Sequence, residues 1–471
     1  MKKIVLILVI VLIGIAGWAG ATYLIGGQVE QHYRDGITRF EQWGPLKLTP
    51  ESYQRGFLSS KARTLMELSV PVPAEEEGEV ETETLRLTLE TKLQHGPLPV
   101  GAGIAPKLAC IETRLVVASI GEDDLLAKLP WLGEITDRSS IGFSGGGRSR
   151  LVVPAFEKTV EEEQLTISWG GLRLDSEFSA NLGELSGDLE LAGLQLTAED
   201  GGLQWDGAKA DFDLHESFPM VYLGSFQTSS GPFELDFNEA GKRQKVRLEG
   251  IAVDYLASQN GSTVEYLETL KVEKVDLNDD GYGPGELEIS VRGLDGEVLS
   301  QYQKDVLEVY GQESFDSEVI GLQMMQVYLR LLSGLAEGTP EIEFRKLQFA
   351  TPKGDFSGNL RLKLHGEPGL ELNNVSALLQ KVEGQAQLTA DESLVRTVMT
   401  GMLAQEMKKA FQQQEMPQPS DEEIAIMAGS QVEQQLEALI GQQFIERSDG
   451  KFRCQAVFKD GQLKVNGQRM M

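Results

Sequence analysis

The sequence predicts an α+β protein that is mostly antiparallel β sheet, with late amphipathic helices and one N-terminal transmembrane helix. Three observations carry this prediction. Apolar and polar residues alternate in several segments, glycine-containing breaks separate those segments, and an uncharged apolar run opens the chain. Glycine supplies 51 of 471 residues, above the usual share of about 7%, which suits many turns between short strands.

The apolar run is the clearest single feature. Ile4 to Gly27 contains no charged residue, and as a helix it spans about 36 Å, enough for the hydrocarbon core of a bilayer. Lys2 and Lys3 precede it, and the first charge after it is Glu30. The positive-inside rule then leaves the N-terminus in the cytoplasm and exports residues 28–471. We expect a single-pass protein of the cell inner membrane whose bulk lies in the periplasm.

A cleaved signal peptide is the alternative interpretation of this run. Ala19-Gly20-Ala21 fits the small-x-small pattern that signal peptidase cuts. The apolar run continues through Tyr23, Leu24 and Ile25, which favours an uncleaved anchor. Whether cleavage follows Ala21 is left open at this point, and either interpretation exports the rest of the chain.

The charge balance excludes nucleic acid as a partner. The formal net charge is −29, from 43 basic and 72 acidic residues. A surface this negative repels phosphate backbones. It also repels anionic lipid head groups unless a hydrophobic anchor holds it at the membrane. The expected partners are therefore the cell membrane through residues 4–27, and a lipid or an envelope protein, with homo-oligomer formation left open.

Strands are predicted where apolar residues recur with a period of two. The clearest series are Leu85-Leu87-Leu89, Leu189-Leu191, Phe344 to Phe349 and Leu360-Leu362-Leu364. Such sheets are apolar on one face and polar on the other. The breaks at Gly170-Gly171, Gly201-Gly202, Ser230-Gly231 and Asp280-Gly281 indicate hairpin turns in a long meander.

Helices are expected near the anchor and late in the chain. We expect them over Val29 to Trp43, ended by Gly44-Pro45, within Val306 to Leu335, over Asp391 to Gln414, and from a capping box at Ser420 and Glu423 through Ile440. In the second of these, Val319, Leu322, Val327 and Leu331 are predicted to share one face. Two strands, Phe452 to Phe458 and Gln462 to Val465, close the chain. The predicted domains are an anchor (1–27), a β-rich body (28–390) and a helical pair with a closing hairpin (391–471).

Candidate chemistry is sparse, so we expect no enzyme, no cofactor and no catalytic or metal site. Gly142-Phe143-Ser144-Gly145-Gly146 matches G-x-S-x-G, but a strand follows where a nucleophile elbow needs a helix. Asp276 to Gly281 resembles the opening of a calcium loop, yet its twelfth position is Leu287 instead of Glu. Cys110 and Cys454 are the two cysteines, and separate buried thiols are favoured over a disulfide. Acidic runs such as Glu161-Glu162-Glu163 follow from the composition and are interpreted as a solvated face. A hydrolase that uses Ser144 or carboxylates is the alternative function.

Five motifs in a fixed order carry a resemblance to a known family. They are Tyr53-Gln54-Arg55-Gly56-Phe57-Leu58-Ser59-Ser60, His95-Gly96-Pro97-Leu98-Pro99, Ile141-Gly142-Phe143-Ser144-Gly145, Leu294-Asp295-Gly296-Glu297 and Gly461-Gln462-Leu463-Lys464-Val465-Asn466-Gly467-Gln468. Together with the N-terminal anchor, this order resembles the YdgA-like family of bacterial proteins, a family classed by its domain of unknown function. The resemblance implies a Gram-negative inner-membrane protein with a periplasmic bulk, and it assigns no activity or catalytic residue.

The motifs themselves indicate structural roles. Arg55-Gly56 and Gly96-Pro97 are turn chemistry, and His95 is interpreted as a turn-capping or packing residue and not as a general base. A sheet with one apolar face needs a cover, which helices, a second subunit or a ligand can supply. We therefore expect a non-enzymatic envelope scaffold or a binder of apolar or lipid ligands, with the sheet face either closed or open.

Overall fold

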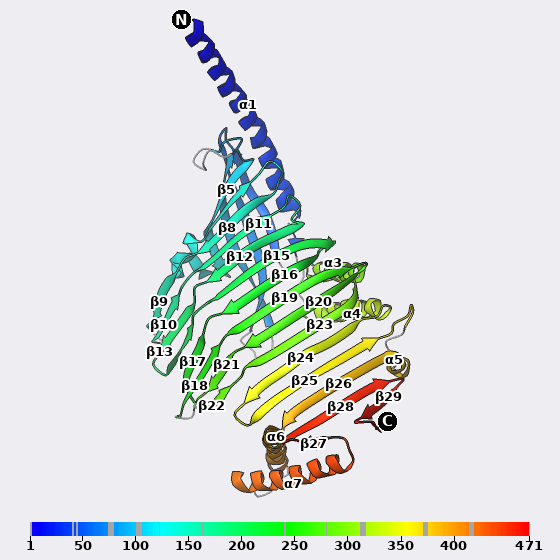
Figure 1. Cartoon of the computed structure of the whole chain (residues 1–471). Helices are drawn as coiled ribbons and strands as arrows, with labels where there is room; N and C mark the ends of the chain where they lie inside the picture. The colour runs from blue at the N-terminus through cyan, green and yellow to red at the C-terminus, as the bar shows by residue number, and fades with distance from the viewer. Residues whose placement is uncertain are drawn as a thin grey trace. The chain divides into compact units, whose positions relative to one another are not determined.

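The computed structural model describes the chain in segments and divides it into two compact units. The described residues are 2–39, 42–43, 46–73, 80–99, 106–121, 123–161, 164–239, 242–278, 280–310, 317–370, 375–413 and 419–470. Unit 1 comprises residues 1–196, 207–226 and 300–330, and unit 2 comprises residues 197–206, 227–299 and 331–471. Strands account for 55% of the chain and helices for 28%, which confirms the prediction of a mostly antiparallel β protein (Figure 1).

The chain opens with one long helix, α1 (Lys2–Arg39), which continues without a break from the predicted anchor. The helix predicted to continue from the anchor over Val29 to Trp43 is wrong at its end, since Gln42–Trp43 form the short strand β1, paired with β2 (Leu46–Arg55). Side chains of α1 are described from Gly17 onward, so most of the apolar run lies outside them. The transmembrane character of α1 stays a prediction.

Unit 1 is built on one series of antiparallel strands. Starting from β2, each strand pairs with the next in the order β3 (Ser59–Pro73), β4 (Val80–His95), β5 (Ala109–Ile120), β7 (Thr136–Ile141), β8 (Gly147–Val153), β11 (Leu172–Phe178), β12 (Glu184–Leu191) and β15 (Ala208–Phe218). The short elements β6 (Asp123–Asp124), α2 (Leu125–Lys128) and the 3-10 turn Pro130–Glu134 lie between β5 and β7.

The register of these strands gives the sheet of unit 1 two distinct faces. One row that crosses eight strands is charged at every position: Lys61, Lys92, Glu112, Arg138, Arg150, Asp175, Asp188 and Asp211. The neighbouring row, which points to the opposite face, includes Leu151, Leu174 and Leu189. The predicted alternation of apolar and polar residues is therefore confirmed in this unit.

Unit 2 repeats the same construction. Its main series runs through β19 (Ile251–Asn260), β20 (Thr263–Val272), β23 (Gly285–Asp295), β24 (Glu341–Thr351), β25 (Gly354–Leu364), β26 (Val382–Asp391), β28 (Lys451–Lys459), β29 (Gln462–Val465) and β30 (Gln468–Arg469), with β27 (Glu446–Ser448) also on β28. A smaller sheet contains β14 (Gly201–Trp205), β17 (Phe233–Glu239), β18 (Lys242–Glu249), β21 (Lys274–Leu277) and β22 (Asp280–Tyr282). The closing strands are as predicted.

Two of the predicted glycine breaks, Gly170-Gly171 and Ser230-Gly231, are corners and not hairpin turns, which corrects the sequence-based prediction there. Gly170-Gly171 joins β10 (Leu165–Trp169), paired with β9 (Phe156–Val160), to β11, which pairs instead with β8 and β12. Gly171 has a φ of +104° and Gly250, between β18 and β19, a φ of +65°. At these corners the chain leaves one sheet and enters another, and glycine adopts such φ values at lower cost than other residues. Ser230-Gly231 likewise lies between β16 (Val221–Ser230) and β17.

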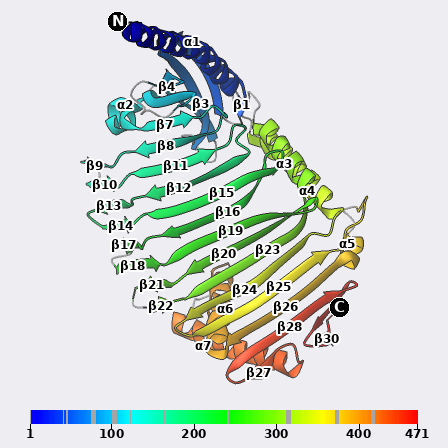
Figure 2. The same cartoon turned by 45° about the horizontal axis from the view of Figure 1, so that its top comes forward.

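Two late helices cover part of the sheet in unit 2. They are α6 (Glu392–Gln413) and α7 (Asp421–Gly441), and the predicted capping box of Ser420 and Glu423 is present at the start of α7. Val432 and Leu436 pack against Phe452 of β28, together with Val395, Met399 and Leu403 of α6. Of the covers that the sequence left open, helices therefore supply the one at this cluster (Figure 2). The remaining late helix, α5 (Val375–Lys381), is short.

Helices α3 (Gly296–Tyr310) and α4 (Ser317–Ala336) replace the single predicted stretch. Val319–Ala336 is the one helical segment, among the residues described, that is long and apolar enough to cross a membrane, and 11% of it is buried. The predicted apolar face is wrong in part, because Val327 is 1% exposed whereas Leu322 is 63% exposed. Leu322 shares an exposed stripe with Met325, Leu329 and Leu332.

Replacing Leu436 by Asp should destabilise the protein strongly. Leu436 is 2% exposed in the α7 cluster, and losing a buried Leu costs about 2–5 kcal/mol before the desolvation of a carboxylate is added. Thermal unfolding measures the effect, with Ile426→Asp on the exposed face of the same helix (66% exposed) as the matched control. Equal melting temperatures for the two variants would show that this cluster does not hold α7.

Candidate functional site

The junction of α1 with the sheet of unit 1 is the best-packed feature near the predicted anchor. One stripe of α1 is buried, at Thr22, Ile25, Val29 and Ile37, with the spacing of a helix face. Ile25 and Val29 form a core cluster with Ala62, Leu93, Leu108 and Ala109 of the sheet. Farther along, the Tyr33 hydroxyl lies 2.6 Å from Oγ1 of Thr64. The helix is thus fixed to β3, β4 and β5 by a continuous apolar contact.

Two glycines let α1 approach the sheet closely. A Cβ atom placed on Gly26 would lie 2.7 Å from Nδ1 of His95, and one on Gly27 would lie 3.3 Å from Nη1 of Arg55. Arg55 donates a hydrogen bond to the carbonyl oxygen of Tyr23, and its guanidinium lies 4.7 Å from the centre of the Tyr23 ring. Arg55 therefore holds the helix instead of pairing with a carboxylate at this point.

His95 is buried beneath α1 and bridges two parts of the sheet. Its Nε2 lies 2.8 Å from Oγ of Ser60, and its Nδ1 lies 3.2 Å from the carbonyl oxygen of Phe57. Burial lowers the pKa of His95; the bond to Phe57 opposes this shift and the nearby charge of Arg55 adds to it. A neutral ring that donates from Nδ1 to Phe57 and accepts from Ser60 fits these contacts.

Ser60 and His95 have the distance of a nucleophile and its base, which the sequence did not reveal. Ser60 is 0% and His95 2% exposed, so no substrate reaches the hydroxyl. A catalytic pair must contact its substrate. The two side chains therefore fasten the β2–β3 turn to β4, in agreement with the packing role predicted for His95.

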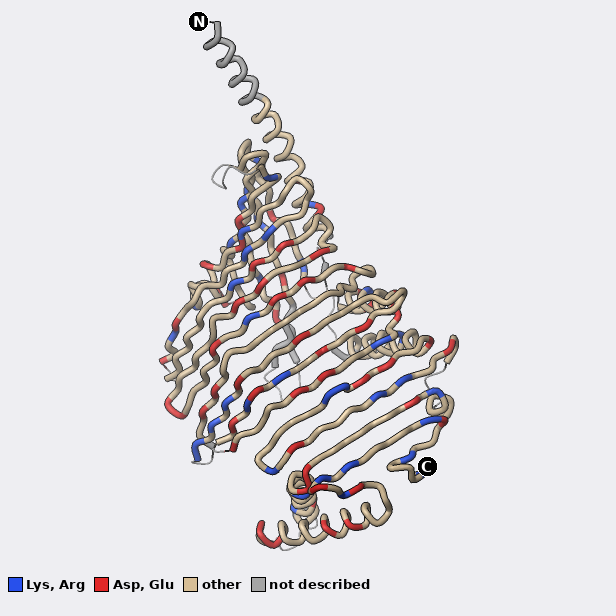
Figure 3. Tube along the Cα trace, viewed as in Figure 1, with Lys and Arg blue, Asp and Glu red and all other residues tan. Residues whose placement is uncertain are grey.

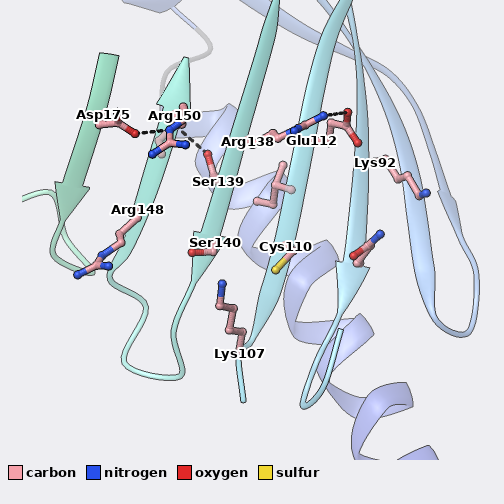
Figure 4. A pocket seen from close by; sticks show the side chains of 13 residues that line it. Lys92, Lys107, Cys110, Glu112, Arg138, Ser139, Ser140, Arg148, Arg150 and Asp175 are labelled. Carbon is pink, nitrogen blue, oxygen red and sulfur yellow. Dashed lines mark hydrogen bonds and ion pairs between the residues drawn. The ribbon is translucent and has the colours of Figure 1, made fainter. Parts of the chain in front are cut away.

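A pocket of about 720 Å³ lies on the strands β4, β5, β7, β8 and β11 of unit 1. Its charged lining contains five basic side chains and two acidic ones (Figure 4): Lys92, Lys107, Arg138, Arg148 and Arg150, with Glu112 and Asp175. Three of the basic residues come from the charged row of the sheet. The lining is therefore net positive in a chain whose net charge is −29.

Both acids of this pocket are held as ions. Glu112 accepts from Arg114 at 2.7 Å and lies 3.5 Å from Arg138, and Asp175 accepts from Arg150 and Arg173. The hydrogen bond from Arg114 is the main reason that the pKa of Glu112 is lowered, and the bond from Arg150 does the same for the pKa of Asp175. Anions are the ligand class that such a lining suits.

In unit 2, one face of the main sheet carries leucines that remain partly exposed. A single row contains Val253, Leu270, Leu287, Leu347 and Leu388. Leu362 lies on the same face, four residues along β25 from Gly358 of that row. Leu270, Leu362 and Leu388 are 40%, 38% and 42% exposed. The helices α6 and α7 cover the end of this face near Phe452, so the face is partly covered and partly open.

The remaining predicted sites are plain structural elements. Ser144 lies in the turn between β7 and β8, so a strand follows it, as predicted. Asp276 and Leu277 of β21 pair with Gly281 and Asp280 of β22 in a hairpin, and Asp279 lies outside the described residues. Cys110 and Cys454 are both free. Within the described ranges, no group of His, Cys, Asp and Glu has the arrangement needed to hold a metal ion.

The comparisons with known proteins identify the family of the chain. A family model described as "Bacterial protein of unknown function (DUF945)" matches residues 1–471. The chain belongs to the DUF945 family. No curated protein and no solved structure matches it, so the geometry of this DUF945 protein is the basis for any functional argument.

Gly26→Ala should weaken the junction, because the new methyl group would lie 2.7 Å from Nδ1 of His95. Overpacking of this kind costs roughly 1–3 kcal/mol. Gly20→Ala is the matched control, since nothing lies within 4 Å of a Cβ at that position of the same helix. We expect a lower melting temperature for Gly26→Ala alone, and equal stability of the two variants would contradict the described packing of α1.

Acidification should destabilise the protein partly through His95. The pKa of His95 is lower in the folded chain. As the pH falls through about 6.5, His95 is therefore protonated in the unfolded chain while it stays neutral in the folded chain. The stabilisation is present above this pH and is lost below it. His95→Gln should reduce the fall in melting temperature between about pH 7.5 and pH 5.5, with His215→Gln on the exposed side of β15 as the control. An unchanged fall would mean that the pKa of His95 is not lower in the folded chain than in the unfolded chain.

Proposed function

We propose that this DUF945 protein is an uncleaved, single-pass inner-membrane protein that holds its body in the periplasm and binds an apolar or lipid ligand without acting as an enzyme. The finer YdgA-like assignment, which rests on the ordered motifs, is part of this proposal. The orientation rests on Lys2 and Lys3 before the uncharged run.

The geometry of α1 supports an uncleaved anchor. Cleavage after Ala21 would make Thr22 the new N-terminus, yet Thr22 is 0% exposed and its hydroxyl donates to the carbonyl oxygen of Trp18 at 2.9 Å. A charged amino group at a buried position is costly. The helix that holds the sheet would also lose the turn that precedes its first buried contacts.

The partly exposed leucines of unit 2 are the observation that carries the ligand proposal. Full burial of a leucine side chain contributes about 1.5–3 kcal/mol, so an apolar face left in water gives up stability that a hydrocarbon ligand would restore. The exposed positions share one face with rows that are apolar apart from Gly358 and Gly384. A long apolar strip of this kind suits an acyl chain better than a compact polar substrate.

The ligand is tested by native mass spectrometry of the full-length protein, released from membranes in mild detergent. We expect bound phospholipid on the wild-type chain. Since 1.4 kcal/mol corresponds to a tenfold change in affinity, Leu362→Gln combined with Leu388→Gln should reduce the lipid-bound fraction about tenfold. Leu256→Gln is the matched control, because Leu256 is 50% exposed on the opposite face of β19.

Two results would contradict this proposal. Equal loss of lipid in the Leu256 control would remove the role of the apolar face. A wild-type chain that carries no lipid would leave a tethered scaffold as the function.

The anchor is tested independently by alkaline carbonate extraction followed by intact mass measurement. The full-length chain should stay in the membrane pellet, with Met1, formylated or deformylated, at its N-terminus. A soluble product that begins at Thr22 would show cleavage and contradict the uncleaved anchor.

A further inference from the structure

Three strand connections of unit 1 meet at the same end of the sheet. The β2–β3 turn is fastened to β4, because the amide of His95 donates to the carbonyl oxygen of Leu58 at 2.9 Å. The β4–β5 connection is fastened to the β7–β8 turn, because the amide of Leu108 donates to the carbonyl oxygen of Ile141 at 2.9 Å. The described residues of these connections therefore lie together at one edge of the sheet, which we call the juxtamembrane rim.

The rim carries large apolar side chains that point away from the protein core. Each of its three tips contributes at least one such side chain: Phe57 (49% exposed), Leu58 (42%), Leu98 (43%) and Phe143 (56%). Apolar tips grouped at one edge mark a contact with a membrane or another apolar surface.

The rim lies level with the end of the predicted anchor. Gly26 of α1 lies against His95, at the base of the first two tips, and Arg55 donates to the carbonyl oxygen of Tyr23. The uncharged run Ile4 to Gly27 ends at this height, and Figure 1 shows α1 continuing beyond the sheet from here. If α1 crosses the bilayer as proposed, the bilayer surface meets the rim.

Basic side chains lie directly behind the apolar tips. The row His95, Ala109, Ile141 and Gly147 borders the tips, and the next row contains Cys110, Ser140 and Arg148. Lys107 and Arg148 belong to the positively charged pocket, and Lys92 and Arg138 of the same pocket lie two rows farther in. Figure 4 shows Lys107 just before β5, Arg138 on β7, and Arg148 and Arg150 on β8, and Figure 3 shows Lys and Arg in blue among these strands.

We propose that the juxtamembrane rim is a second membrane-binding surface, in which the apolar tips enter the interface and the basic pocket binds the head groups of anionic phospholipids. The proposal rests on the proposed function, because α1 must bring the rim to the bilayer. Charge complementarity selects the lipid class: a positive pocket in a chain of net charge −29 attracts anionic head groups that the rest of the surface repels. The apolar tips fit a bilayer and have no use in binding a free anion from water.

The test places an environment-sensitive fluorophore (NBD) on Ser144→Cys, next to Phe143, in a full-length chain with Cys110→Ala and Cys454→Ala. The chain is reconstituted into nanodiscs of phosphatidylcholine with or without phosphatidylglycerol. We expect the emission to rise and shift to the blue when phosphatidylglycerol is present. The same label on Glu161→Cys, in the β9–β10 turn of the same unit, should keep the emission of a water-exposed probe in both discs.

The role of the charges is tested by Lys107→Glu combined with Arg148→Glu, which should abolish the response to phosphatidylglycerol. Arg243→Glu combined with Lys245→Glu, on β18 of unit 2, is the matched control and should keep it. Where the first pair lowers the melting temperature, Lys107→Gln with Arg148→Gln replaces it, and the same loss is expected.

Three results would overturn the inference. The label at Ser144 could behave like the one at Glu161, its response could be equal in both discs, or both charge-reversal pairs could abolish the response equally. Co-elution of the chain with the nanodisc separates this failure from that of the proposed anchor. A chain that leaves the disc contradicts the proposed anchor. A retained chain whose probe at position 144 stays exposed to water contradicts only the proposed role of the rim.

Discussion

The contact between α1 and the sheet of unit 1 is the constraint on which the proposed function depends. A transmembrane helix joined to a domain by a flexible linker would tether it and nothing more. Here Ile25 and Val29 pack on Ala62, Leu93 and Ala109. Close packing of this kind fixes the orientation of the sheet relative to the helix. The helix that would cross the bilayer therefore also sets how the strands of unit 1 are oriented toward the bilayer.

A sheet with one charged face and one apolar face is stable in water only if something covers the apolar face. In unit 1 part of the cover is α1, whose buried stripe lies on the face that carries Leu87 and Leu89. In unit 2 the cover is α6 and α7 around Phe452. Neither cover reaches the whole face, and the leucines that remain half exposed are the reason that a lipid ligand is the function proposed.

Periodicity predicted the strands, their faces and the two late helices, because alternation and helical spacing are local properties of sequence. The capping box at Ser420 and Glu423 is equally local, and it is present. The corner at Gly171 was predicted to be a hairpin turn, because a glycine pair indicates a change of chain direction but not which strand each flanking strand pairs with. The predicted apolar face of α4 was wrong at Leu322 for a related reason. The apolar residues of this helix have the helical period of several alternative faces, and tertiary packing buries the face that contains Val327. The charged row, the pocket and the contact of His95 with Ser60 depend on register across strands that are distant in sequence, which no single segment encodes.

Hydrogen–deuterium exchange of the full-length protein in nanodiscs tests the central claim most directly, because amide protection reports whether α1 is one ordered helix held by the sheet. The account predicts strong and continuous protection from Thr22 through Tyr33, with no fast-exchanging gap at Gly26 and Gly27, and slow exchange of β3 and β4 at the same contact. Rapid exchange at residues 24–30 beside a protected sheet would show a flexible joint, and would contradict a rigid connection between anchor and body.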